Sequence, residues 1–211
     1  MEEYKKNPRQ THYSNFTKKC IYGLAKLFGY NSLASTAILK SHMLYRPCSL
    51  QLERNRDFFI NVCKLPDNFQ TWFSVTHLHI WMMMVHLRTH EHGKRYMQEV
   101  VNRFFEDIED RIIDLGINQQ RLITNYIKDY IAQCHGSVQA FDEGMCKDDT
   151  VLAAALWRNV LSPSVATTAT VEANNLALLV RYVRAQLQNM DQYKDVMEGH
   201  VDFAKLDTTP L

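Results

Sequence analysis

The chain has 211 residues, of which 46% are hydrophobic and 22% charged, and its formal net charge is +1 at pH 7. This length and composition fit a soluble globular protein that buries its own core, which argues against a fold held together by disulfides or a structural metal. The five cysteines are widely spaced without a CxxC pair, so we expect reduced thiols, as in the cytosol or mitochondrial matrix.

The first quarter of the chain is basic, although the whole chain is almost neutral. Residues 4–52 contain no Asp or Glu, and eight cations outweigh Glu2 and Glu3 to give residues 1–52 a charge of +6, which leaves −5 for residues 53–211. Such an arm suits nucleic acid or lipid headgroups; the alternative is a solvated basic face without a partner. Acid-poor N-termini also occur in mitochondrial transit peptides, but the two glutamates argue against one that begins at Met1.

Helical periodicity starts within this arm. Apolar residues recur at helical spacing before Gly29, where a helix would stop: Phe16, Cys20, Leu24, Leu27 and Phe28. A short helix is predicted from Ser32 to Tyr45, ended by Arg46-Pro47, and another over residues 53–64, broken at Leu65-Pro66.

Asp67 is predicted as the N-cap of a helix that continues, with or without a kink, to Gly93. This helix contains HLHIWMMMVHLR at residues 77–88, a segment too apolar all round for an ordinary surface helix. One interpretation is a central core helix. The other is that part of its surface accepts an apolar partner, because flexible methionines adapt to irregular surfaces. Both can hold if one face is core and another is groove.

The second half of the chain continues in the same period. Residues 94–115 are predicted to form a long amphipathic helix that Gly116 closes, and Asn118 is predicted to cap the next helix, which carries the periodic run from Leu122 to Cys134.

A capped helix is also predicted over TVLAAALWRNV, residues 150–160, with Asp148 or Asp149 as its N-cap. Residues 162–171 have the composition of a loop, and a last helix holds the apolar residues from Leu176 to Leu187.

No segment alternates apolar and polar residues over the length of a strand, so we predict an all-α fold. It would be a compact helical domain of about six to eight helices with a basic N-terminal helical extension. The predicted divisions are an extension at 1–52, a helical domain at 53–200 and a C-terminal tail at 201–211.

Residues 68–87 are not predicted to span a membrane, because their densely apolar part is about eleven residues and a span needs about 20. A metal site has better support, since His86 and His90 are four residues apart on one helical face and His92 is close by. HExxH, ExxH and HD are all absent, however, so hydrogen-bonded or surface histidines are the default. A metal- or haem-binding helical protein is the alternative function.

Signatures of catalysis are missing as well. The chain has no GxSxG, no GxGxxG and no Gly-rich phosphate loop, and its cysteines lack a recognisable catalytic context. We therefore expect neither an enzyme nor a cofactor. An RNA-binding helical module is a third possibility, which depends on the basic arm alone.

Four segments together resemble the ubiquinol–cytochrome c chaperone family: LPDNFQTWFSVTHLHIWMMMVHLR, RFFEDIEDR, DEGMCKDDTVLAAALWRN and LLVRYVRAQL. The resemblance covers roughly residues 60–200. At His86-Leu87-Arg88 the family pattern would be an aliphatic residue followed by Arg-Leu-Arg, so Arg88 is the arginine that matches.

The resemblance implies a non-enzymatic assembly chaperone for respiratory complex III, on the matrix side of the mitochondrial inner membrane. Such a chaperone would bind newly made cytochrome b near the mitochondrial ribosome, together with a small helical partner, and would act on no small-molecule substrate. The basic residues expected to contact the ribosome, or the inner membrane peripherally, are Lys5, Lys6, Arg9, Lys18, Lys19 and Lys26.

Eight residues are candidates for binding the client or the partner: Trp72, Phe73, Trp81, Met84, Arg88, Asp149, Trp157 and Arg158. Structural roles are the first expectation for all of them except Met84. The three tryptophans could equally be core anchors, Asp149 a helix cap, and Arg158 the partner of a carboxylate such as Glu106 or Asp107.

Overall fold

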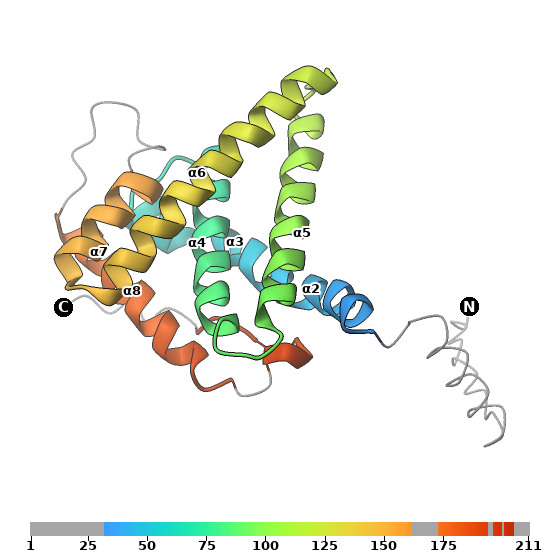
Figure 1. Ribbon diagram of the computed structural model, residues 1–211. Coiled ribbons are helices and arrows are strands. Elements are labelled where there is room, and N and C mark those ends of the chain that lie inside the picture. The colour runs from blue at the N-terminus through green and yellow to red at the C-terminus, as the bar shows by residue number, and fades with distance from the viewer. Residues whose placement is uncertain (1–31, 162–172, 194–195, 200, 205–211) are drawn as a thin grey trace, which may run out of the picture. The chain divides into compact units, whose positions relative to one another are not determined.

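The computed structural model describes residues 32–161, 173–193, 196–199 and 201–204 (Figure 1). The chain divides into two compact units, Met1–Thr36 and Ala37–Leu211. The described residues contain seven α-helices and no strand, which confirms the predicted all-α fold. The helix predicted from Phe16 to Phe28 and the loop predicted at 162–171 lie outside the described residues.

The first described helix, α2 (Leu33–Ser49), does not end at Arg46-Pro47 as predicted. Pro47 lies inside it and is buried, and Leu44 and Cys48 on either side are fully buried. Core packing on both sides of the proline therefore outweighs its tendency to end a helix. The helix predicted at 53–64 is divided into α3 (Gln51–Arg54) and a π-helical turn η1 (Asp57–Val62).

Helix α4 (Phe69–Leu87) begins one residue later than predicted and ends six residues earlier. Its N-cap is Asn68, whose side chain accepts a hydrogen bond from the Thr71 amide at 2.9 Å, whereas Asp67 forms an ion pair with Arg56. The predicted continuation to Gly93 is wrong because the chain turns sharply at residues 88–92. A Cβ at position 93 would lie 1.7 Å from the carbonyl oxygen of Leu87, so this turn requires glycine.

Two long helices follow, α5 (Gly93–Asp114) and α6 (Gln120–Cys146). Gly116 follows the end of α5, as predicted, but the N-cap of α6 is Gln119 without a side-chain capping bond, so the predicted Asn118 cap is wrong. Figure 1 shows α5 and α6 meeting at the loop that joins them and separating from there.

The remaining elements are α7 (Asp149–Leu156), a second π-helical turn η2 (Trp157–Leu161), α8 (Ala173–Met190) and a short 3₁₀ helix η3 (Val196–Glu198). Asp148 caps α7 by accepting from the amide of Val151 at 3.3 Å, which is one of the two predicted caps.

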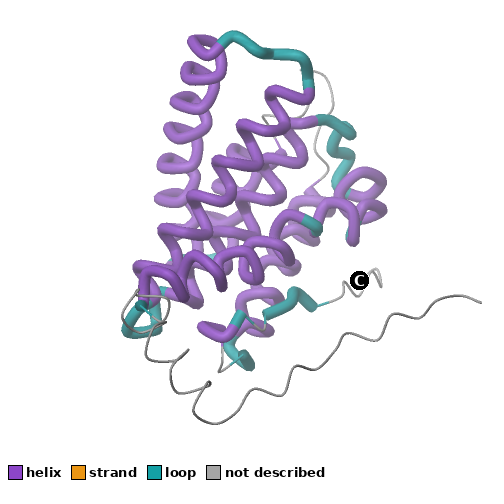
Figure 2. The backbone as a smooth tube through the Cα atoms, turned by 90° about the vertical axis from the view of Figure 1, so that its right-hand side faces the viewer, coloured by secondary structure: helices purple, strands orange, loops and turns teal. Residues whose placement is uncertain are grey.

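Helix α4 is the central element of the second unit. It packs against α3, α5, α6, α8 and η2, and every residue from Thr71 to Met83 is buried. Figure 2 shows the same helices and their connecting loops turned by 90°, with no strand among the described residues. None of the helices in the described part of the chain combines the length and hydropathy of a membrane span. The core-helix interpretation of this segment is confirmed.

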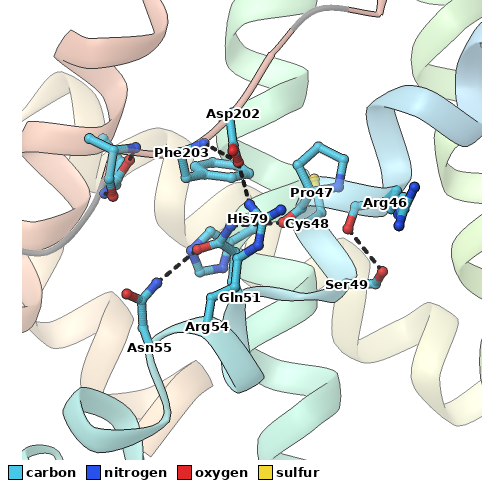
Figure 3. Close-up of polar contacts among 12 residues, drawn as sticks. Arg46, Pro47, Cys48, Ser49, Gln51, Arg54, Asn55, His79, Asp202 and Phe203 are labelled. Atoms are coloured by element: carbon cyan, nitrogen blue, oxygen red, sulfur yellow. Dashed lines mark hydrogen bonds and ion pairs between the residues drawn. The ribbon is translucent and has the colours of Figure 1, made fainter.

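Residues 201–204, the start of the predicted tail, pack on this core. Val201 and Phe203 are buried, and the Phe203 ring meets His79 of α4 edge to face at 4.7 Å. Arg54 of α3 is paired with Asp202 at 2.5 Å (Figure 3). At the other end, residues 37–52 of the predicted extension belong to the second unit.

Candidate functional site

An apolar groove of about 330 Å³ lies between α4, α5 and α6. Its floor is on α4 and its two walls are on α5 and α6, the helices that separate from their connecting loop (Figure 1). The residues that shape it include Met84, Val101, Phe105, Val138, Cys134 and His77.

Met84 is the methionine that reaches this groove. Met82 and Met83 are fully buried, whereas Met84 is half-buried. The structure therefore divides the three methionines between packing and a partly open surface. Met84 is the residue for which the sequence favoured a binding role.

Each wall of the groove is formed by a second row of apolar residues, which lies beside the row that faces the core. On α5, Val100 and Phe104 are buried, while their neighbours Val101 and Phe105 are half-buried. On α6, Val138 is half-buried. A single face packed on the core would not need this second row.

Trp72 and Phe73 lie in the core and not on an open surface. Their side chains are 6% and 3% exposed. Phe73 packs against Tyr130 at 4.5 Å between ring centroids, and the guanidinium of Arg111 lies 3.9 Å from the Trp72 ring centroid. An Arg over an indole face is a favourable cation–π arrangement. These two aromatic residues join α4 to α5 and α6.

Trp81 and Arg88 meet at one acceptor, Asp142 of α6. Its Oδ1 atom accepts from Trp81 Nε1 at 2.8 Å and from Arg88 Nη1 at 2.7 Å. Trp81 is fully buried, so its indole N–H needs such a partner. Both residues therefore hold α4 against α6 beside the groove.

The last three candidates lie elsewhere, on α7 and η2. Asp149 is paired with Arg184 of α8 at 3.1 Å, while Trp157 is 47% exposed and Arg158 is exposed. The suggested pairing of Arg158 is wrong, because Glu106 is paired with Arg103 and Asp107 with Arg111.

The same Arg184 completes the end of α6. It donates hydrogen bonds to the carbonyl oxygens of Met145, Gly144 and Lys147 at 3.0, 3.2 and 3.1 Å. Carbonyl groups at a helix C-terminus lack partners within the helix, and a cation there also complements the helix dipole. Arg184, which the sequence did not single out, thus ties α6, α7 and α8 together.

The histidines near the end of α4 do not form a chelating group. His86 Nε2 lies 2.9 Å from the carbonyl oxygen of Tyr193, a contact in which this nitrogen must donate, and His92 is exposed. The rings of His86 and His90 meet edge to face, with centroids 5.4 Å apart. Across the described ranges, no three His, Cys, Asp or Glu residues gather as potential metal ligands. The geometry gives the metal- or haem-binding alternative no support.

Two other histidines of α4, His77 and His79, are buried, and no pattern in the sequence distinguishes them from the remaining histidines. His79 donates from Nδ1 to the carbonyl oxygen of Val75 at 2.7 Å and accepts from the hydroxyl of Tyr182 at 2.5 Å. His77 lines the groove. Burial lowers the pKa of each ring from 6.5 to about 4, so both are neutral near pH 7.

Comparison with known proteins gives a consistent result. Residues 61–199 match the family model described as ubiquinol-cytochrome C chaperone. The chain is 34% identical over 147 residues to "Protein CBP3, mitochondrial" of Saccharomyces cerevisiae, covering 68% of this chain and 43% of that protein. It is 37% identical over 136 residues to "Ubiquinol-cytochrome-c reductase complex assembly factor 1" of Xenopus laevis, covering 64% of this chain and 65% of that protein.

The human assembly factor of the same name is 35% identical over 136 residues, which are 64% of this chain and 43% of the human protein. The chain thus spans between about two fifths and two thirds of these relatives. The crystal structure of the Cbp3 homolog from Brucella abortus has the same fold, with a TM-score of 0.69 and 21% identity over 88% of this chain and 98% of that one.

Proposed function

Because the chain belongs to the ubiquinol–cytochrome c chaperone family, whose members are assembly chaperones and not enzymes, we propose that it assists the assembly of mitochondrial respiratory complex III. The name of the yeast relative supports the mitochondrial location, and the names of the frog and human relatives support the role in assembling ubiquinol–cytochrome c reductase. The chaperone acts by contact, without chemical change of its client.

The proposed client is newly made cytochrome b, and the proposed contact is the groove between α4, α5 and α6. Every apolar square ångström of a membrane protein left in water costs about 25 cal/mol, which drives aggregation before membrane insertion. A groove with Met84 on its floor and Phe105 on one wall would cover part of that surface. The half-buried state of Met84, which directly follows a run of buried residues from Thr71 to Met83, is the observation that carries this proposal.

A small helical partner and the mitochondrial ribosome, on the matrix side of the inner membrane, complete the proposal. Lys5, Lys6, Arg9, Lys18, Lys19 and Lys26 lie outside the described residues, and their contact with the ribosome or the membrane stays a prediction. Such contacts release counterions, so co-sedimentation with mitochondrial ribosomes should decline steeply as salt is raised.

The test replaces Met84 with Glu and follows newly made cytochrome b by pulse labelling in cells that lack the wild-type gene. A carboxylate on the groove floor must be desolvated to bind an apolar segment, so we expect cytochrome b to be degraded and complex III to be lost. Leu122→Glu is the matched control, because Leu122 is an exposed apolar residue of α6 outside the groove. Normal cytochrome b lifetime in the Met84→Glu strain would refute the groove as the client site.

A further inference from the structure

His77 is the one buried polar side chain among the residues that line the groove, and it is held rigidly. Its side chain is 5% exposed. The imidazole lies nearly parallel to the rings of Phe73 and Phe104, at interplanar angles of 8° and 19°. An orientation fixed in this way suits a recognition role as well as a packing role.

Its hydrogen bond to Ser137 determines which ring nitrogen carries the proton. The Ser137 hydroxyl has one hydrogen, and its oxygen lies 2.7 and 3.1 Å from the carbonyl oxygens of Gln133 and Cys134, which can only accept. The same oxygen is 3.3 Å from His77 Nδ1. It is therefore the acceptor toward His77, and the proton lies on Nδ1.

The other nitrogen, Nε2, is then an acceptor without a proton. Burial holds the pKa of His77 at about 4, so the ring does not gain a second proton near neutral pH. Among the described residues, none donates a hydrogen bond to Nε2. A ligand that fills the groove with purely apolar groups would leave this nitrogen without water or a partner, which costs free energy.

We propose that the groove selects an apolar polypeptide segment that anchors through a tyrosine or tryptophan, whose O–H or N–H donates to His77 Nε2. The inference rests on the proposed client-binding role of the same groove. Tyrosine and tryptophan combine a large apolar ring with one donor, which matches an apolar lining with one acceptor. A volume of about 330 Å³ accepts large side chains and not a whole helix, which is about 10 Å across.

The test is a double-mutant cycle with two labelled peptides and the full chain. Both peptides are Lys-flanked Leu/Ala helices of identical sequence, except that the central residue is Tyr in one and Phe in the other. Fluorescence anisotropy should show that the wild-type protein binds the Tyr peptide about 2- to 12-fold more tightly, as one net hydrogen bond predicts. In His77→Phe, which keeps the ring stacking and removes the acceptor, this ratio should fall to about 1.

Ser137→Ala provides a second route that leaves the imidazole in place. Without its acceptor on Nδ1, His77 is free to carry the proton on Nε2, and the preference for Tyr should again fall. ¹⁵N NMR of the histidine rings reports the tautomer directly and should show a proton on Nδ1 in the wild-type protein. If His77→Phe fails to fold, the Ser137→Ala ratio decides.

Four outcomes would overturn the inference. A preference for Tyr that persists in both His77→Phe and Ser137→Ala, or a wild-type proton on Nε2, would remove His77 as the acceptor while leaving the groove intact, provided that Met84→Glu weakens both peptides. If neither peptide binds, or if Met84→Glu changes neither affinity, the proposed binding groove itself fails and the inference fails with it.

Discussion

At the scale of single residues, one oxygen atom of Asp142 joins two of the residues that the sequence marked as candidates. Trp81 and Arg88 are seven positions apart on the same side of α4, and both donate to Asp142 Oδ1. The sequence indicated the two donors but not their acceptor, because Asp142 is 54 residues beyond Arg88 and only the approach of α6 to α4 brings them together.

Asp142→Ala should destabilise the protein more than Asp142→Asn. The alanine leaves the fully buried Trp81 indole N–H without an acceptor, which costs about 1–3 kcal/mol in the free energy of unfolding. The asparagine keeps a carbonyl oxygen at the same place. Urea denaturation of both variants would measure the difference, and equal losses would show that charge, not the shared acceptor, is what Asp142 contributes.

For helix caps, the sequence predicts where a helix begins but not which of two adjacent polar residues is its N-cap. Asp148, one of the two predicted caps of α7, does cap that helix. Asp67, the predicted cap of α4, pairs with Arg56, and Asn68 caps the helix in its place. Asp and Asn are equally good caps, so adjacent polar residues cannot be ranked until the tertiary partners of each are known.

At the scale of elements, α4 makes stability depend on pH below neutrality, because it buries two neutral histidines. The pKa of His77 and of His79 is about 4 in the folded chain and 6.5 in the unfolded chain. Between these values the unfolded chain binds protons that the folded chain does not. The free energy of unfolding should therefore fall as pH decreases from 6.5 toward 4, by about 1.4 kcal/mol per pH unit for each histidine.

Urea unfolding at pH 7.5 and pH 5.5 would test this dependence. His77→Phe should reduce the loss by about half, because one of the two groups is removed. His42→Gln, at an exposed position on α2, should leave the loss unchanged. Equal stability of the wild-type protein at both pH values would contradict neutral histidines in the folded state.

The contact of α6 with α7 depends on a glycine. A Cβ at Gly144 would lie 2.7 Å from the Cα of Leu152, so Gly144→Ala must push the two helices apart and should cost about 1–3 kcal/mol. Gly136 of the same helix has nothing within 4 Å of such a Cβ, and Gly136→Ala should stabilise the protein by about 0.5–1 kcal/mol. Thermal unfolding of the pair should give shifts of opposite sign.

The helical spacing of the apolar residues predicted which segments form helices. It predicted the ends of those helices less well. Pro47 lies inside a helix that the sequence predicts to stop there, because Pro47 itself is buried and Leu44 and Cys48 on either side of it pack in the core. The groove was predicted only in part: Met84 was identified, but Val101 and Val138 were not. The sequence does show that the apolar stripe is wider than a single packed face requires. Whether the extra apolar residues are buried or line a groove depends on how far α5 and α6 separate, which the sequence does not show.

At the scale of the second unit as a whole, residues 201–204 hold distant helices together. Gln186 of α8 donates to the carbonyl oxygen of Ala204 at 2.9 Å and accepts from its amide at 2.8 Å. Asp202 is paired with Arg54 of α3, and Phe203 covers His79 of α4. One short segment therefore contacts three helices.

Gln186→Ala should release this segment, because it leaves the N–H and C=O groups of Ala204 without their hydrogen-bond partner. We expect the loss to weaken the attachment of the segment by about 1–3 kcal/mol. Limited proteolysis followed by mass spectrometry should then show faster cleavage within residues 196–204. Gln188→Ala, at an exposed position of the same helix, is the matched control and should be cleaved at the wild-type rate. Equal rates in all three proteins would show that Gln186 does not retain the segment.

This arrangement also sets an order of events during synthesis. Translation delivers α3 and α4 long before residue 202, which follows Arg54 by 148 positions. The Phe203 ring can therefore pack against His79 only after translation has passed residue 204. The mature packing of the central helix is therefore completed late relative to the synthesis of α4, and a nascent chain that stalls before residue 202 would leave this side of His79 exposed to quality-control proteases.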